Sequence, residues 1–221
     1  MNVSVQRVTV EYQRRRVLDN IDLEIEAGEF MCIVGQTGCG KSTLLRLILG
    51  EQTPSSGRVL VGGKERRQPD PTCGYVPQKY SLFPDRTVLG NVMFGLKGRG
   101  ASETALKMLL RTGLRESDVS KYPHQLSGGM QQRVAIAQAL VMNPPVLLMD
   151  EAFSALDPGT RAGMQRLIKE LWDESGTTIV FVTHNTREAV YLGTRVIALA
   201  NQSIALDLSA PAEEELEHVF L

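Results

Sequence analysis

The chain has 221 residues, 43% of them hydrophobic, which fits one globular domain with a sizeable core and subdomains. A formal net charge of −1 gives no electrostatic attraction to nucleic acid or to an anionic membrane surface. The three cysteines stand singly without metal-ligand spacing, so we expect no disulfide framework, and a reducing cytosol fits. No apolar stretch approaches the ~20 residues that span a bilayer, and the N-terminus shows no signal-peptide pattern. Any role at a membrane is therefore expected to depend on a partner.

Apolar and polar residues alternate near the N-terminus, in residues 3–12 and 21–25, which predicts half-buried antiparallel strands. Later segments are apolar throughout, as in parallel strands that are covered on both faces. These segments are residues 30–34, 146–150 and 178–183. Residues 84–125 contain no strand-like run and are expected to form short helices, including one that Ser102 caps and that ends at Gly113.

The first chemical motif follows the first apolar run. Residues 35–43, GQTGCGKST, fit the phosphate-loop pattern GxxxxGK[ST] between a predicted strand and a predicted helix. Its glycines let backbone N–H groups turn inward around phosphates at the positive end of a helix dipole. Lys41 is expected to reach the β- and γ-phosphates, and the Ser42 hydroxyl to hold Mg²⁺. The nucleotide-binding residues predicted here are Gly35, Gln36, Thr37, Gly38, Cys39, Gly40, Lys41, Ser42 and Thr43.

Two carboxylates follow the apolar run at 146–150. Asp150 ends a predicted buried strand, where it would deliver a carboxylate to the Mg²⁺ shell of the phosphate site. Glu151, one residue further, can leave the strand tip and polarise the attacking water as a general base. A single acidic residue at a strand end is common, and it is the phosphate loop upstream that favours the catalytic interpretation.

A second candidate anion site lies at residues 126–133, LSGGMQQR, ahead of a predicted helix. Ser127 is a good N-cap, and Gly128 and Gly129 bare the backbone N–H groups of a helix N-terminus, which binds anions. Because the phosphate loop already serves one nucleotide, we interpret this helix end as a second phosphate-binding site, for a nucleotide held by another copy of the chain. The alternative is an ordinary helix cap with a flexible glycine pair. The face of this helix expected to be buried carries Val134, Ala137, Leu140 and Val141.

These motifs together resemble the ATP-binding-cassette (ABC) ATPases, over residues 1 to about 200. The resemblance implies an α/β fold: a P-loop NTPase core with a mostly parallel sheet and an N-terminal antiparallel β subdomain. A helical subdomain, about residues 84–140, is expected to be inserted within a single domain that covers 1–221. The expected activity is hydrolysis of ATP with Mg²⁺.

The resemblance also implies roles for single residues. Tyr12 matches the aromatic residue that stacks on adenine, with Val17 nearby, and His184 matches the switch histidine that contacts the γ-phosphate. Gln78 is similar to the glutamine that reaches Mg²⁺ and the attacking water. The catalytic set is then Glu151, His184, Asp150, Lys41 and Gln78, and the metal set is Ser42, Gln78 and Asp150.

A second copy of the chain is the first implied partner. Two copies would sandwich two ATP molecules head to tail, with ATP favouring closure and hydrolysis allowing the halves to part. The residues expected to serve the partner's nucleotide are Ser127, Gly128, Gly129 and Gln131. Residues 154–157, SALD, resemble the D-loop that crosses the dimer seam, and Asp157 also caps a helix that begins at Pro158.

The segments 83–96 and 122–140 are most similar to ATPases of bacterial nitrate, sulfonate and taurine importers. This implies a membrane permease that docks near Gln78–Leu89, where Phe83, Pro84 and Leu89 could line a groove. A solute-binding protein in the complex, no nucleic acid, and a cytoplasmic location on the inner face of the cell membrane are also implied.

Three positions depart from that group: Asp85 replaces a frequent tryptophan, Gln138 a common arginine, and Asn185 a frequent aspartate. None belongs to the hydrolytic set, but Asp85 leaves the substrate group open. The alternative is a cassette that drives iron–sulfur assembly, lipoprotein release or cell division without transport. A simple P-loop kinase would explain neither the 126–133 motif nor His184. The cargo is not encoded in these residues, and the direction of transport rests on the resemblance.

Overall fold

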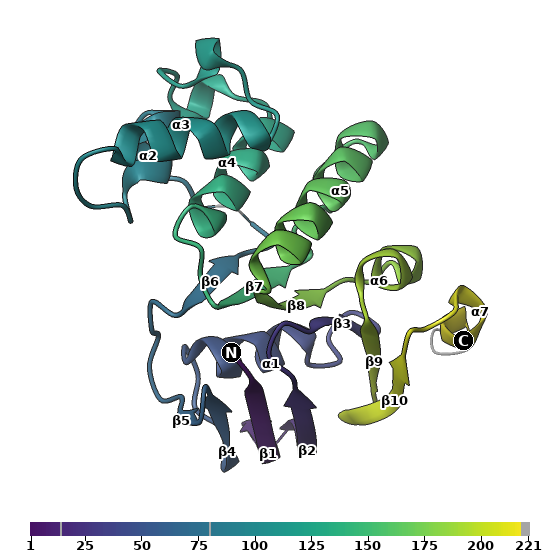
Figure 1. The fold of residues 1–221 in the computed structure, drawn as a ribbon. Helices are drawn as coiled ribbons and strands as arrows, with labels where there is room; N and C mark the ends of the chain where they lie inside the picture. Colours follow the sequence, from purple (N-terminus) through teal and green to yellow (C-terminus); the bar gives the residue numbers. More distant parts are fainter. Residues whose placement is uncertain (14, 80, 218–221) are drawn as a thin grey trace.

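The computed structural model describes residues 1–13, 15–79 and 81–217. Figure 1 shows two sheets in the lower part of the molecule and a group of helices above one edge of the larger sheet. Tyr80, within the expected docking segment, lies outside the described residues.

The smaller sheet is antiparallel and has the strand order β2-β1-β4-β5. Its strands are β1 (Val3–Tyr12), β2 (Arg15–Ile25), β4 (Ser56–Val61) and β5 (Lys64–Glu65). The alternating residues of β1 and β2 turn their apolar side chains inward, so Val3, Val5 and Ile25 are buried. The antiparallel strands predicted at the N-terminus are confirmed.

The larger sheet has the order β10-β9-β3-β8-β7-β6 and is parallel except for β10, which pairs antiparallel with β9. Its strands are β3 (Phe30–Val34), β6 (Cys73–Val76), β7 (Val146–Asp150), β8 (Thr178–Val182), β9 (Arg195–Ala200) and β10 (Ser203–Ser209). All residues of β3, β7 and β8 are buried, as continuous apolar runs predict.

Helix α1 lies between the two sheets, while α5 and α6 cover the opposite face of the larger sheet (Figure 1). Helices α2, α3 and α4 pack on one another around a third apolar cluster. The helices are α1 (Lys41–Leu49), α2 (Val88–Met93), α3 (Ala101–Arg111), α4 (Gly128–Leu140), α5 (Pro158–Ser175), α6 (Thr186–Leu192) and α7 (Glu213–Glu217). Two 3-10 turns occupy Glu116–Asp118 and Pro123–Gln125. Among the described helices, none is both long and apolar enough to cross a membrane.

Two details of the helix predictions are wrong. Helix α3 is capped by Gly100, with φ +93°, so Ser102 lies inside the first turn and is not the cap. On α4, Val134 and Ala137 belong to the cluster of α2 and α3, but Leu140 packs against the cluster under α5. Because α4 touches both clusters, its apolar residues are divided between two faces.

Candidate functional site

Residues of the phosphate loop meet Gln78, Glu151 and His184 at the carboxyl ends of the parallel strands, where α/β sheets bind ligands. A pocket of about 370 Å³ there receives the phosphate loop from β3, and side chains that follow β6, β7 and β8. Its lining residues are Val17, Thr37, Gly38, Gly40, Lys41, Ser42, Thr43, Gln78, Glu151 and His184. Ten positions from five separate segments of the chain thus form one pocket.

Lys41 lies inside the phosphate loop rather than pointing into solvent. It is 6% exposed, and its Nζ donates hydrogen bonds to the backbone oxygens of Gly35 at 2.8 Å and Gln36 at 2.9 Å. A buried ammonium needs such acceptors, because an unpaired charge costs much free energy. Phosphate oxygens of a nucleotide are the natural acceptors to replace these carbonyls.

The curvature of the loop depends on Gly40, which has φ +108° and precedes α1. A Cβ there would lie 2.6 Å from Leu18 Cδ2 and 3.1 Å from the Val17 oxygen. At Gly38, with φ +84°, a Cβ would meet no atom within 4 Å.

We therefore expect Gly40→Ala to lower the free energy of unfolding by about 2 kcal/mol and to weaken ATP binding, because strain and steric overlap add. Gly38→Ala is the control and should cost about 1 kcal/mol, because it adds backbone strain alone. Urea denaturation and titration with a fluorescent ATP analogue measure both effects. Equal losses for the two variants would contradict this steric account of the loop.

Asp150 ends β7 beside Ser42, with only 6% of its surface exposed. Burial raises the pKa of the Asp150 carboxyl, although a hydrogen bond from the Ser42 side chain opposes the rise. A buried carboxylate paired with a hydroxyl is a donor set of hard oxygens, which suits Mg²⁺. The residues present therefore fit a magnesium ion bound with the nucleotide.

Glu151 lies between two other predicted catalytic residues. Its Oε2 accepts a hydrogen bond from Gln78 Nε2 at 2.9 Å, and its Oε1 is 3.4 Å from His184 Nδ1. Glu151 has φ +47°, a left-handed conformation that costs a non-glycine residue of the order of 1 kcal/mol. This turn takes its side chain off the line of β7 and into the pocket, where a general base would be needed.

A second pocket continues from the first, because Val17 and Gly38 line both. It measures about 480 Å³, and Tyr12 in its wall is 46% exposed. An exposed aromatic face beside a phosphate loop can stack on a base. The remaining lining residues are Arg15, Arg16, Cys39, Asn201 and Gln202. The sequence did not single out Asn201 and Gln202. The pairing of β9 with β3 brings them to the site, and the Asp19 N–H donates to the Gln202 oxygen at 2.8 Å.

Eight predicted residues do not line these two pockets. Gly35 and Gln36 belong to the phosphate loop and Asp150 ends β7, whereas the other five are Ser127, Gly128, Gly129, Gln131 and Asp157. Ser127 caps α4 and accepts a hydrogen bond from the Met130 N–H at 3.4 Å. Asp157 caps α5, and hydrogen bonds from Thr160 lower the pKa of its carboxyl. Within one chain, the N-terminal end of α4 at Gly128 therefore does not line the phosphate-loop pocket.

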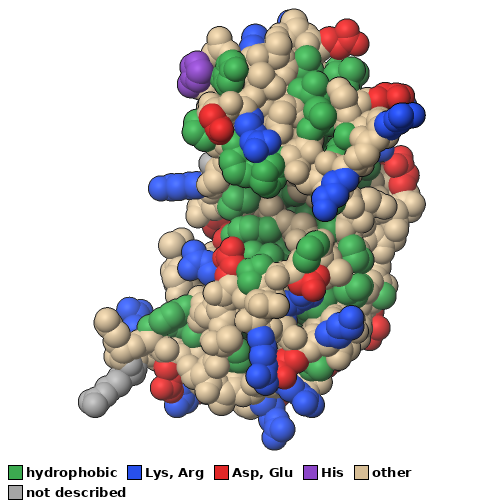
Figure 2. All heavy atoms as spheres, turned by 90° about the vertical axis from the view of Figure 1, so that its left-hand side faces the viewer, with side chains coloured by type: hydrophobic (Ala, Val, Ile, Leu, Met, Phe, Trp, Pro, Cys, Tyr) green, Lys and Arg blue, Asp and Glu red, His purple; other side chains and the backbone are tan. Residues whose placement is uncertain are grey.

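The edge of the larger sheet carries an apolar groove. Figure 2 shows hydrophobic side chains gathered across the middle of the face that presents the β6 edge. The groove measures about 510 Å³ and lies between β6 and α4. Phe94 and Met142, respectively 55% and 48% exposed, stand in its wall. The other lining residues are Pro71, Cys73, Gly74, Tyr75, Pro77, Ser81, Ala135, Gln138, Ala139 and Pro144.

Phe83, Pro84 and Leu89, which the sequence suggests for a docking groove, do not line this pocket. Leu89 packs into the cluster of α2, α3 and α4. Phe83 supports the groove from behind: its ring centroid is 4.5 Å from that of Phe94, and the Arg86 guanidinium lies 4.6 Å from the Phe94 ring.

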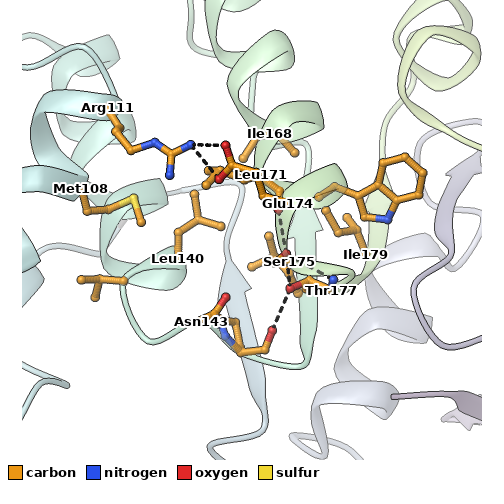
Figure 3. Close-up of a pocket in the computed structure, with 14 residues that line it drawn as sticks. Met108, Arg111, Leu140, Asn143, Ile168, Leu171, Glu174, Ser175, Thr177 and Ile179 are labelled. Carbon is orange, nitrogen blue, oxygen red and sulfur yellow. Dashed lines mark hydrogen bonds and ion pairs between the residues drawn. The ribbon is translucent and has the colours of Figure 1, made fainter.

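A further pocket of about 310 Å³ lies between α3, α4 and α5 and shares no residue with the phosphate site (Figure 3). Its walls are mostly apolar, with Leu140, Ile168 and Leu171 among them. Arg111 of α3 donates to both carboxylate oxygens of Glu174 on α5, at 3.2 and 3.1 Å. This exposed ion pair ties α3 to α5, and nothing in the pocket resembles a phosphate site.

The comparisons with known proteins agree with this geometry. A family model described as "ABC transporter" matches residues 18–154. An uncharacterized ABC transporter ATP-binding protein, MJ0412 of Methanocaldococcus jannaschii, is 45% identical over 211 residues, 90% of this chain and 79% of that protein. The aliphatic sulfonates import ATP-binding protein SsuB of Zymomonas mobilis is 43% identical over 96% of this chain and 87% of its own length.

Two further matches concern a nitrate importer and a solved structure. The nitrate import ATP-binding protein NrtD of Synechocystis is 45% identical over 90% of this chain and 77% of that protein. The dimeric ATP-binding cassette MJ0796, in a post-hydrolysis state bound to ADP and Pi, superposes with a TM-score of 0.86 at 34% identity. That match covers 95% of this chain and 99% of the solved one.

Proposed function

We propose a function from one premise: this chain belongs to the ABC transporter family, whose model covers residues 18–154, more than half of its length. As a member of that family it is an ATPase, and it energises a membrane importer of a small solute. The observation that carries this function is the single pocket that joins Lys41, Gln78, Glu151 and His184. Tyr12, in the adjoining pocket, would stack on adenine.

Hydrolysis would use the chain's own side chains in defined roles. Lys41 and the backbone N–H groups of the loop hold the β- and γ-phosphates, and Glu151 takes the proton of the attacking water. Gln78 orients that water, and His184 contacts the γ-phosphate beside Glu151. Mg²⁺, held by Ser42, Asp150 and Gln78, would neutralise charge that develops on the transferred phosphoryl group.

The chain would act as a head-to-tail dimer. Ser127, Gly129 and Gln131 lie outside the phosphate pocket of their own chain, so they can serve a nucleotide held by a second copy. The γ-phosphate would bridge the copies, and closure then depends on the extra contacts that ATP makes in the closed state. Similarity to the dimeric cassette MJ0796 supports this arrangement.

The apolar groove beside β6 is the proposed docking site of the permease. Its exposed Phe94 and Met142 match the apolar core that protein interfaces need, and it adjoins Pro77, next to the catalytic Gln78. A helix seated there could sense the nucleotide through Gln78. A permease docked at this groove would hold the chain on the cytoplasmic face of the membrane.

Phe94→Asp is expected to reduce recovery of the permease at least tenfold while leaving the ATPase rate of the isolated chain within about twofold, because a charge in an apolar interface core is costly. Leu110→Asp, which places the same charge on an exposed leucine of α3, is the matched control. Pull-down from detergent-solubilised membranes measures permease recovery. Equal recovery with both variants would contradict the docking surface.

The relatives suggest an oxyanionic solute, because one is named for aliphatic sulfonates and another for nitrate. Purification of the chain from its native membranes, with partners identified by mass spectrometry, tests the importer. A multi-span permease and a solute-binding protein are expected. Recovery with soluble partners alone would instead support the non-transport cassette.

A further inference from the structure

A buried hydrogen-bond network lies behind His184, and the hydrolytic roles above make no use of it. Its centre is Glu188 of α6, which is 8% exposed. Glu188 Oε2 accepts a hydrogen bond from Thr183 Oγ1 at 2.7 Å, and Oε1 accepts one from Gln165 Nε2 of α5 at 3.2 Å. A carboxylate buried to this degree requires such partners.

Both neighbours of His184 are tied to Glu188. On one side, Thr183 donates to the carboxylate, and on the other, Asn185 Oδ1 accepts from the Glu188 N–H at 3.3 Å. The two neighbours are also joined, because the Asn185 N–H donates to Thr183 Oγ1 at 3.0 Å. The Thr183 N–H donates to the Ile33 oxygen at 3.1 Å, just before the phosphate loop. The backbone of His184 is thus fixed, while its ring stays exposed in the pocket.

Glu188 also faces the segment 154–157 through Arg161. One guanidinium nitrogen of Arg161 donates to the Leu156 oxygen at 2.9 Å. Its Nε lies 3.8 Å from Glu188 Oε1 and, among the described residues, is a buried donor without a hydrogen-bond partner. Buried donors are normally satisfied, so a small displacement that brings Arg161 onto Glu188 would be favourable.

A small cavity of about 70 Å³ connects this network with the general base. Its wall contains Glu151 and His184 together with Arg161 and Glu188. Ser154, from the segment that would cross the dimer seam, completes the same wall with Thr183 and Asn185. The Glu188 carboxylate therefore lies between the loop that carries His184 and the segment 154–157.

We propose that Glu188 is a positioning residue for ATP hydrolysis. Through Thr183 and Arg161, it fixes the position of the loop that carries His184 relative to the segment 154–157. The role given to 154–157 rests on the proposed function, because it requires the head-to-tail dimer whose seam this segment is expected to cross. Glu188 does not touch the nucleotide. Its effect is on the geometry of His184 and of the residues at the seam, where a displacement of about 1 Å can cost on the order of 100-fold in rate.

The sharpest test compares Thr183→Val with Thr183→Ser, because the two variants differ in whether the hydroxyl bonds to Glu188 and Asn185 are kept. Thr183→Val should lower kcat on the order of tenfold or more with ATP affinity within about twofold, and Thr183→Ser should restore most of the rate. A merely structural role would instead appear as parallel losses of thermal stability and of ATP binding. Equal kcat values for Val, Ser and wild type would overturn the proposal.

A double-mutant cycle tests whether Glu188 and Arg161 act through one network. Glu188→Gln and Arg161→Met should each lower kcat, and the double variant should be no slower than the slower single variant, since one network is broken in each case. If the two losses of kcat multiply in the double variant, Glu188 and Arg161 act independently, and the proposed link between them is overturned. If Glu188→Gln does not fold, the Thr183 pair still decides the role of the carboxylate. Hydrolysis and ATP-dependent dimerisation by the wild-type chain test the proposed function separately.

Discussion

Glu151→Gln is expected to bind ATP normally and to lose turnover on the order of 1,000-fold, because the substitution keeps the shape of the side chain but removes the general base. The residues proposed to hold the phosphates belong to the loop, and Lys41 has its hydrogen-bond partners there rather than at Glu151. Phosphate release at saturating Mg-ATP measures turnover, and titration with a fluorescent ATP analogue measures affinity.

Glu170→Gln is the matched control for this prediction. Glu170 is an exposed acid on α5 and does not line the phosphate pocket, so its neutralisation should leave turnover unchanged. A Glu151→Gln rate within about threefold of wild type would assign the base to another group. His184, 3.4 Å from the Glu151 carboxylate, would then be the first residue to examine.

Gly129→Asp is expected to lower the rate of ATP hydrolysis at least 100-fold, while leaving the fold and the ATP affinity of the monomer intact. A Cβ at Gly129 would lie 3.5 Å from Leu156 Cδ2, an ordinary contact. An acid in the first turn of α4 favours the helix by about 0.3–1 kcal/mol through the dipole. The same charge would repel the γ-phosphate of a nucleotide held by the other copy. Steady-state ATPase assays and thermal unfolding measure the two effects.

Mixing experiments separate loss of the shared site from loss of the fold. Gly129→Asp retains its phosphate loop, and Lys41→Ala retains its α4 end, so a mixed dimer contains one intact composite site. Hydrolysis should reappear when the two inactive chains are mixed. Ser102→Asp, in the first turn of α3, controls for the added charge and should stay active. Failure of the folded chains to recover any activity would contradict a site shared between copies.

The sequence predicted the buried core strands, and it singled out residues that line the phosphate-loop pocket, because their signals are local. Continuous apolar runs predicted β3, β7 and β8, and the phosphate loop and the Asp150–Glu151 pair stand directly beside them. Strand β6, by contrast, has four residues and includes Gly74. Its pairing with β7 could not be derived from so short and mixed a pattern.

The residues that line the apolar groove depend on packing that the local sequence pattern does not encode. Phe94, and not Phe83, stands in the groove, because Asn91 folds the preceding segment back: its Nδ2 donates to the oxygens of Phe83, Arg86 and Thr87. A buried asparagine with these partners has no signature in the local pattern.

Glu188 was missed for a related reason. It stands three residues after the helix cap Asn185, the spacing of a capping box, in which the acid would bond the N-cap N–H. In the structure that N–H donates to Thr183, and the Glu188 carboxylate accepts from Thr183 and Gln165 instead. Gln165 lies on α5, so the contact exists only once the tertiary structure has formed.

The mass of Glu151→Gln in solution, measured by light scattering with and without saturating Mg-ATP, directly tests the proposed ATP-bridged dimer. Without nucleotide, a chain of 24.3 kDa is expected as a monomer. With Mg-ATP that cannot be hydrolysed, a particle of twice that mass is expected, because the γ-phosphate would bridge the two copies. A monomer at saturating Mg-ATP, with binding confirmed in the same sample, would contradict the ATP-bridged dimer.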